Sequence, residues 1–194
     1  MRILIVSDTH GKVKRVYNIY KKLIKSSPVD LIVHCGDYFD DASEIRAHLG
    51  VRVLQVKGNC DGCFEEDEYA ILETEAGSFF VCHGHMHNVK YNKQTLYYTA
   101  LQSDCIGAIY GHTHRAERTD LGDFMFINPG SLYKPRDGSG GTFSILDTSR
   151  DHAECRILKY EDFMASEDPI PPVKTETKAK GGFLRRIFNY SDGQ

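Results

Sequence analysis

The chain has 194 residues, of which 24 are Lys or Arg and 27 are Asp or Glu, so its formal net charge is −3. This length fits one domain with room for a tail, and a hydrophobic share of 41% supplies an ordinary core. The near balance of charge argues against broad binding of extended nucleic acid, which needs a basic surface. A small phosphorylated substrate is compatible with this net charge, because a bound metal ion could neutralise the charge of the phosphate.

The first sixty residues alternate between apolar strands and helical patterns. Residues 2–7, 29–35 and 51–56 are short apolar runs that predict strands. A helix is predicted between the first two runs, ended by Pro28, and a shorter one over 44–49. The apolar face of the first helix is expected to comprise Val13, Val16, Tyr17, Tyr20, Leu23 and Ile24. Strands alternating with helices indicate a parallel α/β layer.

The later part of the chain is richer in strands. Residues 69–72 and 79–82 flank Ala76-Gly77, which predicts a hairpin, and 96–101 are helical. Further strands are expected over 106–110, 124–127, 142–146 and 155–158. We therefore predict an α/β fold in which two sheets form a β-sandwich flanked by helices, in four layers.

The composition changes near Ala165 to prolines, charges and glycines without an apolar period, which is typical of a linker. We expect one domain over 1–163 and a flexible linker and tail over 164–194. Residues 183–188 are compatible with a short amphipathic helix. This piece is interpreted as a disordered or loosely packed end or, alternatively, as a peptide that docks on a partner or an anionic membrane surface.

Nothing in the sequence resembles a signal peptide, and no apolar stretch approaches the roughly 18 residues of a membrane span. We therefore expect a cytoplasmic protein, with its six cysteines reduced. Cys60 and Cys63 form a C-x-x-C, but a zinc ribbon would need a second such pair. The oligomeric state is not decided by the sequence, and a dimer or a tetramer is compatible with it.

Polar residues of metal-binding types follow nearly every predicted strand. These residues are Asp8 and His10, Asp37, Asn59, His83, and His112 with His114. Loops at the carboxyl ends of neighbouring strands open on one edge of a sheet, so these side chains are expected to converge. A single histidine is usually surface or core filler, which is the interpretation of His48 and His152, and His87 is expected to be exposed. The ordered set of five motifs is not readily produced by chance.

The donor types indicate the chemistry. Carboxylate, amide oxygen and imidazole are donors that suit Mn, Fe, Ni, Zn or Co. They differ from the thiolates of a structural zinc site. Asp37 could bridge two ions about 3.5–4 Å apart, the spacing of two-metal phosphatases and nucleases. A water bridging the ions would then be deprotonated near neutral pH and attack phosphorus in line.

These motifs resemble those of the calcineurin-like metallophosphoesterases, and the short length looks most like the small YfcE-type phosphodiesterases. The resemblance rests on Asp8-Thr9-His10, Gly36-Asp37, Gly58-Asn59, His83, Gly111-His112-Thr113-His114 and Asn128-Pro129-Gly130-Ser131, and it covers roughly residues 1–160. It implies two divalent ions, commonly Mn²⁺. The first would be held by Asp8, His10 and His114, and the second by Asn59, His83 and His112, with Asp37 as the bridge.

The resemblance also implies catalytic candidates, namely Asp37, Asn59, Cys60, Asp61 and His85. Many relatives carry a histidine where this chain has Cys60, and that histidine can protonate the leaving group. A thiol with a pKa of about 8.5 is a weaker acid than the imidazole of histidine and protonates a leaving group less readily. Activated aryl esters are therefore expected to react faster than alkyl esters.

Several nearby residues have less certain roles in this scheme. His85 is expected to support a ligand or to face the substrate. His34 either orients a ligand or is simply buried and satisfied by backbone. Lys134 or Arg136 could meet the substrate's phosphate. The sequence thus predicts a phosphodiesterase for small phosphodiesters. A phosphomonoesterase is the alternative, and a protein-binding scaffold such as the retromer subunit of this fold is a third.

Overall fold

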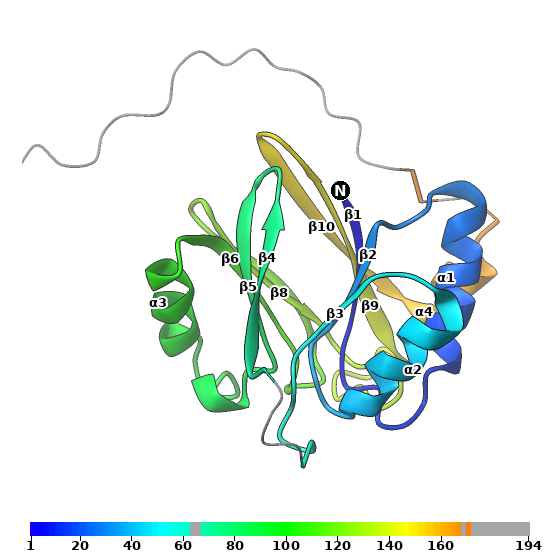
Figure 1. Cartoon of the computed structure of the whole chain (residues 1–194), viewed down its shortest axis with the longest axis horizontal. Coiled ribbons are helices and arrows are strands. Elements are labelled where there is room, and N and C mark those ends of the chain that lie inside the picture. The colour runs from blue at the N-terminus through cyan, green and yellow to red at the C-terminus, as the bar shows by residue number, and fades with distance from the viewer. Residues whose placement is uncertain (63–66, 168–169, 172–194) are drawn as a thin grey trace, which may run out of the picture.

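The computed structural model describes residues 1–62, 67–167 and 170–171, and within them two five-stranded sheets face each other with helices on the outside (Figure 1). This confirms the predicted α/β sandwich. The strand orders are β10-β9-β1-β2-β3 in the first sheet, here called sheet A, and β4-β5-β6-β8-β7 in the second, sheet B.

Sheet A is parallel at one side and antiparallel at the other. Its strands are β1 (Arg2–Val6), β2 (Leu31–His34), β3 (Val53–Gln55), β9 (Thr142–Ser149) and β10 (His152–Lys159). β1 pairs in parallel with β2, and β2 with β3, so their carboxyl ends lie at one edge. β9 and β10 form an antiparallel hairpin beside β1.

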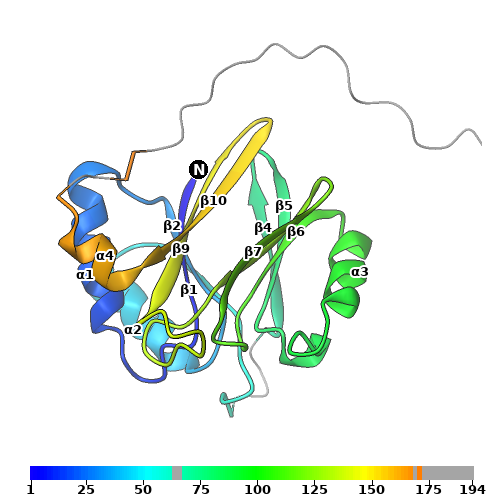
Figure 2. The ribbon, with the colours of Figure 1, turned by 180° about the vertical axis from the view of Figure 1, so that it is seen from behind.

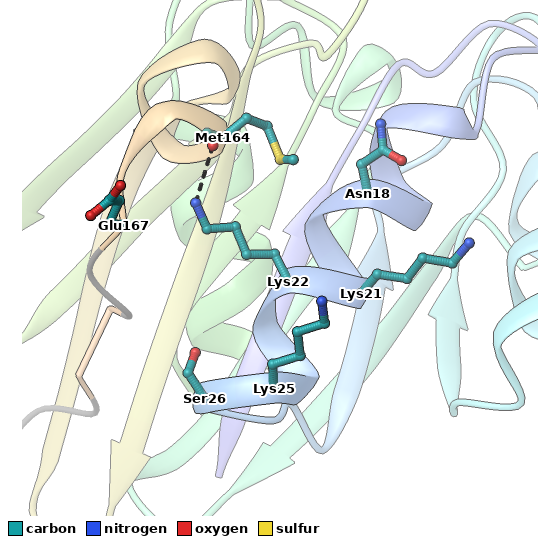
Figure 3. A pocket seen from close by; sticks show the side chains of 7 residues that line it. All are labelled: Asn18, Lys21, Lys22, Lys25, Ser26, Met164 and Glu167. Atoms are coloured by element: carbon teal, nitrogen blue, oxygen red, sulfur yellow. Dashed lines mark hydrogen bonds between the residues drawn. The ribbon is translucent and has the colours of Figure 1, made fainter.

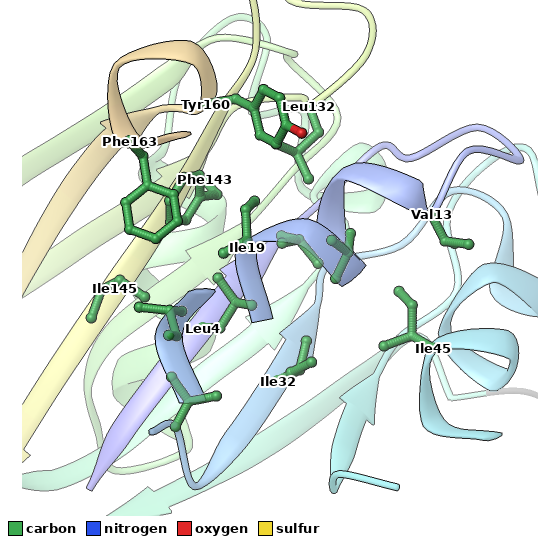
Figure 4. Packing of buried hydrophobic residues seen from close by; sticks show 14 of the residues in the cluster. Leu4, Val13, Ile19, Ile32, Ile45, Leu132, Phe143, Ile145, Tyr160 and Phe163 are labelled. Carbon is green, nitrogen blue, oxygen red and sulfur yellow. The ribbon is translucent and has the colours of Figure 1, made fainter. Parts of the chain in front are cut away.

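Three helices cover the outer face of sheet A: α1 (Lys14–Ser26), α2 (Phe39–Leu49) and α4 (Tyr160–Ala165). Figure 4 shows Ile19 of α1 packed among Leu4, Phe143 and Ile145 of the sheet. Ile19 is fully buried whereas Ile24 is 46% exposed, so the predicted apolar face of α1 was wrong at Ile24 and omitted Ile19. Helix α2 begins five residues earlier than predicted and α4 was not predicted.

Sheet B has β4 (Tyr69–Thr74), β5 (Gly77–Cys82), β6 (Cys105–Tyr110), β7 (Ala116–Leu121) and β8 (Phe124–Pro129), with α3 (Gln94–Gln102) on its outer face. The predicted hairpin is β4–β5. Strand β7, which lies at the edge of the sheet (Figure 2), was not predicted. Most of its residues are exposed and polar, so the alternation of a half-buried strand is absent from its sequence.

The space between the sheets is filled by side chains from both inner faces. Ile3 and Ile5 of β1 and Val33 of β2 are fully buried in one cluster with Phe79 and Val81 of β5. Because alternate residues of a strand point to opposite faces, Leu4 and Val6 instead join the cluster under the helices. This core holds the carboxyl ends of β1, β2 and β5 next to one another.

The end of α4 is fastened to α1. Figure 3 shows Lys22 of α1 reaching across to Met164, where its Nζ donates to the carbonyl oxygen at 3.2 Å. After α4, which ends at Ala165, the structure describes only Ser166, Glu167, Ile170 and Pro171. The predicted docking piece, 183–188, therefore lies outside the described residues, as does Cys63 of the C-x-x-C. In the part of the chain that is described, no helix is long and apolar enough to cross a membrane.

Candidate metal centre

The loops that follow β1, β2, β3, β5 and β6 bring all seven predicted metal ligands together. Five of these residues have left-handed backbone, with φ of 53° at Asp8, 50° at His10, 60° at Asp37, 67° at His112 and 57° at His114. Residues other than glycine adopt this region at a cost of about 1–2 kcal/mol each. Such strain is typical of functional sites, where the surrounding fold imposes it.

One half of the centre consists of Asp8, His10, Asp37 and His114. Each of the four offers a ligand atom, and these atoms all lie within 4.8 Å of one another. His114 Nε2 is 3.0 Å from Asp8 Oδ1 and 3.4 Å from His10 Nε2. Asp8, Asp37 and His114 are buried and His10 is half-buried.

The other half consists of Asn59, His83 and His112, again with Asp37. His83 Nε2 lies 3.2 Å from Asn59 Oδ1, 3.2 Å from His112 Nδ1 and 3.2 Å from Asp37 Oδ1. Burial, followed by the nearby His83, lowers the pKa of His112 to about 4. The ring of His112 is therefore neutral at pH 7 and can offer a lone pair to a cation.

Backbone carbonyls fix the orientation of two of the histidine rings. His83 Nδ1 lies 2.7 Å from the carbonyl oxygen of Cys35, and His114 Nδ1 lies 2.7 Å from that of Lys134. A carbonyl only accepts hydrogen bonds, so Nδ1 carries the proton in each ring. In the neutral ring, Nε2 then presents a lone pair toward the centre, as it does in metal-ligating histidines.

This arrangement fits a cation in each half. Asp8 Oδ1 is buried 3.0 Å from His114 Nε2, and its hydrogen bond and charge raise the pKa of the His114 ring. When His114 is neutral, as a metal ligand must be, these two atoms are an oxygen and a nitrogen lone pair that face each other. Asn59 Oδ1 and Asp37 Oδ1 each lie 3.2 Å from His83 Nε2, the ring nitrogen that faces the centre. Acceptors that face one another in a buried site are unfavourable unless a positive group lies between them. The donor set of oxygen and imidazole nitrogen suits a divalent transition metal.

Gly58 allows the third loop to approach Asp37. A Cβ at this position would lie 2.2 Å from Asp37 Oδ1 and 2.4 Å from its backbone nitrogen. Because glycine has no side chain, the loop can approach Asp37 closely. The backbone N–H of Cys60 then donates to Asp37 Oδ1 at 3.1 Å. The glycine before Asn59 therefore has a steric function in the centre.

A buried hydrogen-bond network supports the Asp8–His10 loop from behind. Thr9 Oγ1 donates to Asp41 Oδ2 at 2.6 Å and lies 2.8 Å from His34 Nε2. Gly11 N also donates to Asp41 Oδ2, at 2.8 Å. His34 Nε2 thus has a side-chain partner, and its Nδ1 has no hydrogen-bond partner, backbone or other, among the described residues. Asp41 was not predicted, although an acidic residue in the first turn of a helix was the available signal.

The remaining predicted residues lie around this centre. Cys60 is exposed, with its Sγ 3.5 Å from Asn59 Nδ2. Asp61 accepts from the backbone N–H of Phe39 at 2.8 Å and of Gly58 at 2.7 Å, so its carboxylate braces two loops. The ring of His85 is 5.4 Å from that of His83 and 6.1 Å from that of His112.

The end of β8 and the loop after it support the centre by donating hydrogen bonds to backbone carbonyls of the ligand loops. Ser131 Oγ donates to the carbonyl oxygen of Asp8 at 2.8 Å, and Asn128 Nδ2 donates to that of Gly111 at 2.9 Å. The backbone N–H of Arg136 donates to the carbonyl oxygen of His114 at 2.9 Å. The side chains of Lys134 and Arg136 are exposed beside the centre, where their positive charge can attract an anion.

Three predicted surface histidines have different surroundings. His48 and His152 are exposed, as expected, and His48 stacks on Tyr17. His87 is half-buried with its ring edge toward Phe80, so the expectation that it would be exposed was wrong. Residue type and spacing do not indicate this contact, because it joins His87 to Phe80 of the preceding strand β5.

Comparisons with known proteins identify relatives over most of the chain. The calcineurin-like phosphoesterase superfamily domain matches residues 1–151. The probable metallophosphoesterase YsnB of Bacillus subtilis is 33% identical over 157 residues, covering 81% of this chain and 90% of YsnB. The phosphodiesterase MJ0936 of Methanocaldococcus jannaschii is 28% identical over 166 residues, covering 77% of this chain and 95% of MJ0936.

A solved structure shows the same architecture. A conserved protein from Streptococcus pneumoniae TIGR4, described as a predicted phosphoesterase, superimposes with a TM-score of 0.67 at 26% identity. The match covers 82% of this chain and 90% of the other.

Proposed function

Because the chain belongs to the calcineurin-like phosphoesterase superfamily, we propose that it is a two-metal phosphodiesterase acting on small phosphodiesters. A metal-dependent phosphoesterase activity follows from the family. The number of ions, the preference for diesters and the role of each residue are our proposal.

The position of Asp37 between two groups of donors carries this proposal. Its Oδ1 is 3.2 Å from His83 Nε2, and its Oδ2 is 4.0 Å from His10 Nε2. One carboxylate thus faces both halves of the centre. We infer that Asp8, His10 and His114 hold one ion, that Asn59, His83 and His112 hold the other, and that Asp37 is shared between them.

Bound ions would polarise the phosphoryl oxygens and lower the pKa of a water nucleophile. The chain's own residues set the geometry of this reaction. Asp61 and Gly58 hold the Asn59 loop against Asp37, while Thr9 and Asp41 hold the first loop. We therefore assign Asp61 a positioning role.

The weak acidity of the Cys60 thiol indicates a preference for substrates with good leaving groups. Partial desolvation of the otherwise exposed Cys60 thiol, followed by the hydrogen bond and charge of Asp37, raises its pKa to about 11. Ions bound by Asp37 would reduce its share of this shift, but even the ordinary thiol pKa of about 8.5 lies above that of imidazole. A thiol that holds its proton this tightly is a weak general acid at neutral pH. We infer that the enzyme depends little on protonating the leaving group, and that esters of acidic alcohols or phenols are cleaved faster than alkyl esters.

Mn²⁺ is the ion that we propose, with Ni²⁺, Fe²⁺, Zn²⁺ and Co²⁺ as alternatives. The donors are carboxylate, amide oxygen and imidazole, and none is a thiolate. Mn²⁺ is the ion that the resemblance to the family implies, and the carboxylate and amide oxygens are compatible with it, whereas the four imidazoles also suit Zn, Fe and Ni. The exposed Lys134 and Arg136 would attract the remaining charge of the phosphate.

Side-by-side assays of bis(p-nitrophenyl) phosphate and p-nitrophenyl phosphate test this function. The purified chain, loaded with Mn²⁺, should hydrolyse the diester with the higher kcat/KM and should lose this activity in EDTA. A higher kcat/KM for the monoester would favour the phosphomonoesterase. Absence of hydrolysis with every divalent metal would contradict a catalytic function and favour the scaffold.

A further inference from the structure

A small cavity adjoins the candidate metal centre at sheet B, and nothing above assigns it a role. Its volume is about 330 Å³, which is at the lower end of the range for small-molecule pockets. Strands β4 and β5 contribute Tyr69 and Phe80, and α3 contributes Thr99. Figure 1 shows these elements on the same side of the molecule, with the turn after β5 at their lower end. That turn, the short helix η1 (His85–His87), also lines the cavity.

His85 connects this cavity to the metal centre. It lines the cavity, and its ring is 5.4 Å from that of His83 and 6.1 Å from that of His112, two of the proposed ligands of one ion. The cavity therefore begins one side chain away from the place where a phosphoryl group would bind. A group attached to that phosphorus could reach the cavity past His85.

The lining of the cavity is suited to a flat, uncharged ring. Tyr69 stacks on Phe80 with ring centroids 5.0 Å apart and an angle of 11°, and the edge of His87 meets Phe80 at 5.6 Å. Tyr69 and Met86 are 55% and 62% exposed, so apolar surface is accessible at its mouth. Because Phe80 is only 2% exposed and stacks against Tyr69, the accessible aromatic surface is that of Tyr69, which can bind a planar group by stacking.

Charge excludes the phosphate itself from this cavity. Among the described residues that line it, Glu68 is the one Asp, Glu, Lys or Arg, and its charge is negative. A phosphoryl group would therefore remain at the metal centre. The buried Nδ1 atoms of His85 and His87 make no hydrogen bond in the described part of the chain. Unsatisfied polar atoms of this kind are rare, and both belong to histidines that line the cavity.

We propose that this cavity binds an uncharged aromatic ester group of the substrate, such as an aryl ring or a nucleobase, while the phosphoryl group binds at the metal centre. The inference rests on the proposed phosphodiesterase function and adds the substrate class. It assigns Tyr69 and Thr99 to substrate specificity.

Two variants test the proposal in the full-length, Mn²⁺-loaded chain. Tyr69→Ala removes an aromatic face, and Thr99→Trp places a large side chain at the cavity. Their matched controls are Tyr98→Ala, at a tyrosine 53% exposed on α3, and Thr95→Trp, one turn earlier on the same helix; neither control residue lines the cavity. The substrate is bis(p-nitrophenyl) phosphate, and inorganic phosphate is used as a ringless inhibitor.

Both cavity variants should raise KM by about 3- to 10-fold, as expected for one aromatic contact, with little change in kcat. The inhibition constant of phosphate should stay constant, since phosphate does not enter the cavity. The controls should behave like the wild type. If KM in both variants equals that of the wild type, or if phosphate inhibition weakens in parallel with KM, the proposal is overturned.

A binding measurement separates this proposal from the proposed function. In ¹H–¹⁵N NMR spectra of the chain, p-nitrobenzyl alcohol, which cannot be hydrolysed, should shift the amides of Tyr69, Gly84 and Ser103, and Thr99→Trp should abolish these shifts. Shifts without any hydrolysis of diesters would support ring binding and contradict the phosphodiesterase. Hydrolysis without shifts, and without a KM effect, would contradict the cavity proposal alone.

Discussion

Asp37 Oδ1 lies 3.2 Å from His83 Nε2, although the two residues come from different sheets. Asp37 follows β2 of sheet A, and His83 follows β5 of sheet B. The candidate metal centre therefore depends on how the two sheets pack, because neither sheet carries the complete set of ligands. Ions bound here would hold the two halves of the sandwich together.

Metal should accordingly stabilise the fold as well as supply chemistry. A ligand that binds only the folded state at 100 times its Kd adds about 2.7 kcal/mol to the free energy of unfolding. We expect Mn²⁺ to raise the Tm and EDTA to lower it again, as measured by calorimetry. The same experiment on His114→Ala should show a smaller rise. A Tm that is insensitive to both additions would contradict metal binding.

Gly58→Ala should damage the centre without touching any ligand. Its Cβ would lie 2.2 Å from Asp37 Oδ1, so either Asp37 or the Asn59 loop must move. We expect a loss of about 10- to 100-fold in Mn²⁺ affinity, measured by isothermal titration calorimetry. Gly62→Ala is the control, because a Cβ there meets nothing within 4 Å. Equal affinities in the two variants would show that the close approach is unimportant.

Asp41→Ala should weaken metal binding from a distance. Thr9 and Gly11 both donate to Asp41 Oδ2, so the variant leaves two donors of the first ligand loop unsatisfied. We expect about 1–3 kcal/mol less stability in urea unfolding and a reduced Mn²⁺ affinity. The neighbouring Asp40 is exposed, and Asp40→Ala should match the wild type in both measurements. Loss of stability with full metal affinity would limit Asp41 to a structural role.

Cys60→His should change how the rate depends on the leaving group. Imidazole is a better general acid than a thiol whose pKa is raised to about 11. A plot of log kcat/KM against the pKa of the leaving phenol should therefore be shallower in the variant, with the largest gain for the poorest leaving group. Cys60→Ser, which introduces no such acid, should keep the steep slope. If Cys60→His also keeps it, Cys60 does not lie at the leaving group.

Most of the fold could be predicted because the apolar runs are continuous and end in distinct polar motifs. The strand and the α-helix that were missed lack that signal, as does the three-residue helix η1. Strand β7 is polar because it lies at a sheet edge, and α4 is only six residues long. Helix α2 starts early, because the left-handed backbone of Asp37 and Tyr38 turns the chain directly into it. Local propensity does not predict a turn that the ligand geometry imposes.

The ligand types of the centre were readable from the sequence because they directly follow predicted strands. The supporting contacts were not. Asp41 reaches Thr9 and Gly11 across 30 or more residues of chain, and the contact of His87 with Phe80 joins a turn to the face of a strand. Such contacts follow from packing, so residue type and spacing alone do not reveal them.

The metal content of Asp37→Ala is the most direct test of a shared carboxylate. Purified wild-type chain, equilibrated with Mn²⁺ and freed of excess, should retain about two ions per chain by elemental analysis, the number expected of a two-metal site. Asp37→Ala should lose at least one of them together with its diesterase activity, while Asp40→Ala should retain both. Wild-type content near zero, or full content and turnover in Asp37→Ala, would contradict the two-metal centre.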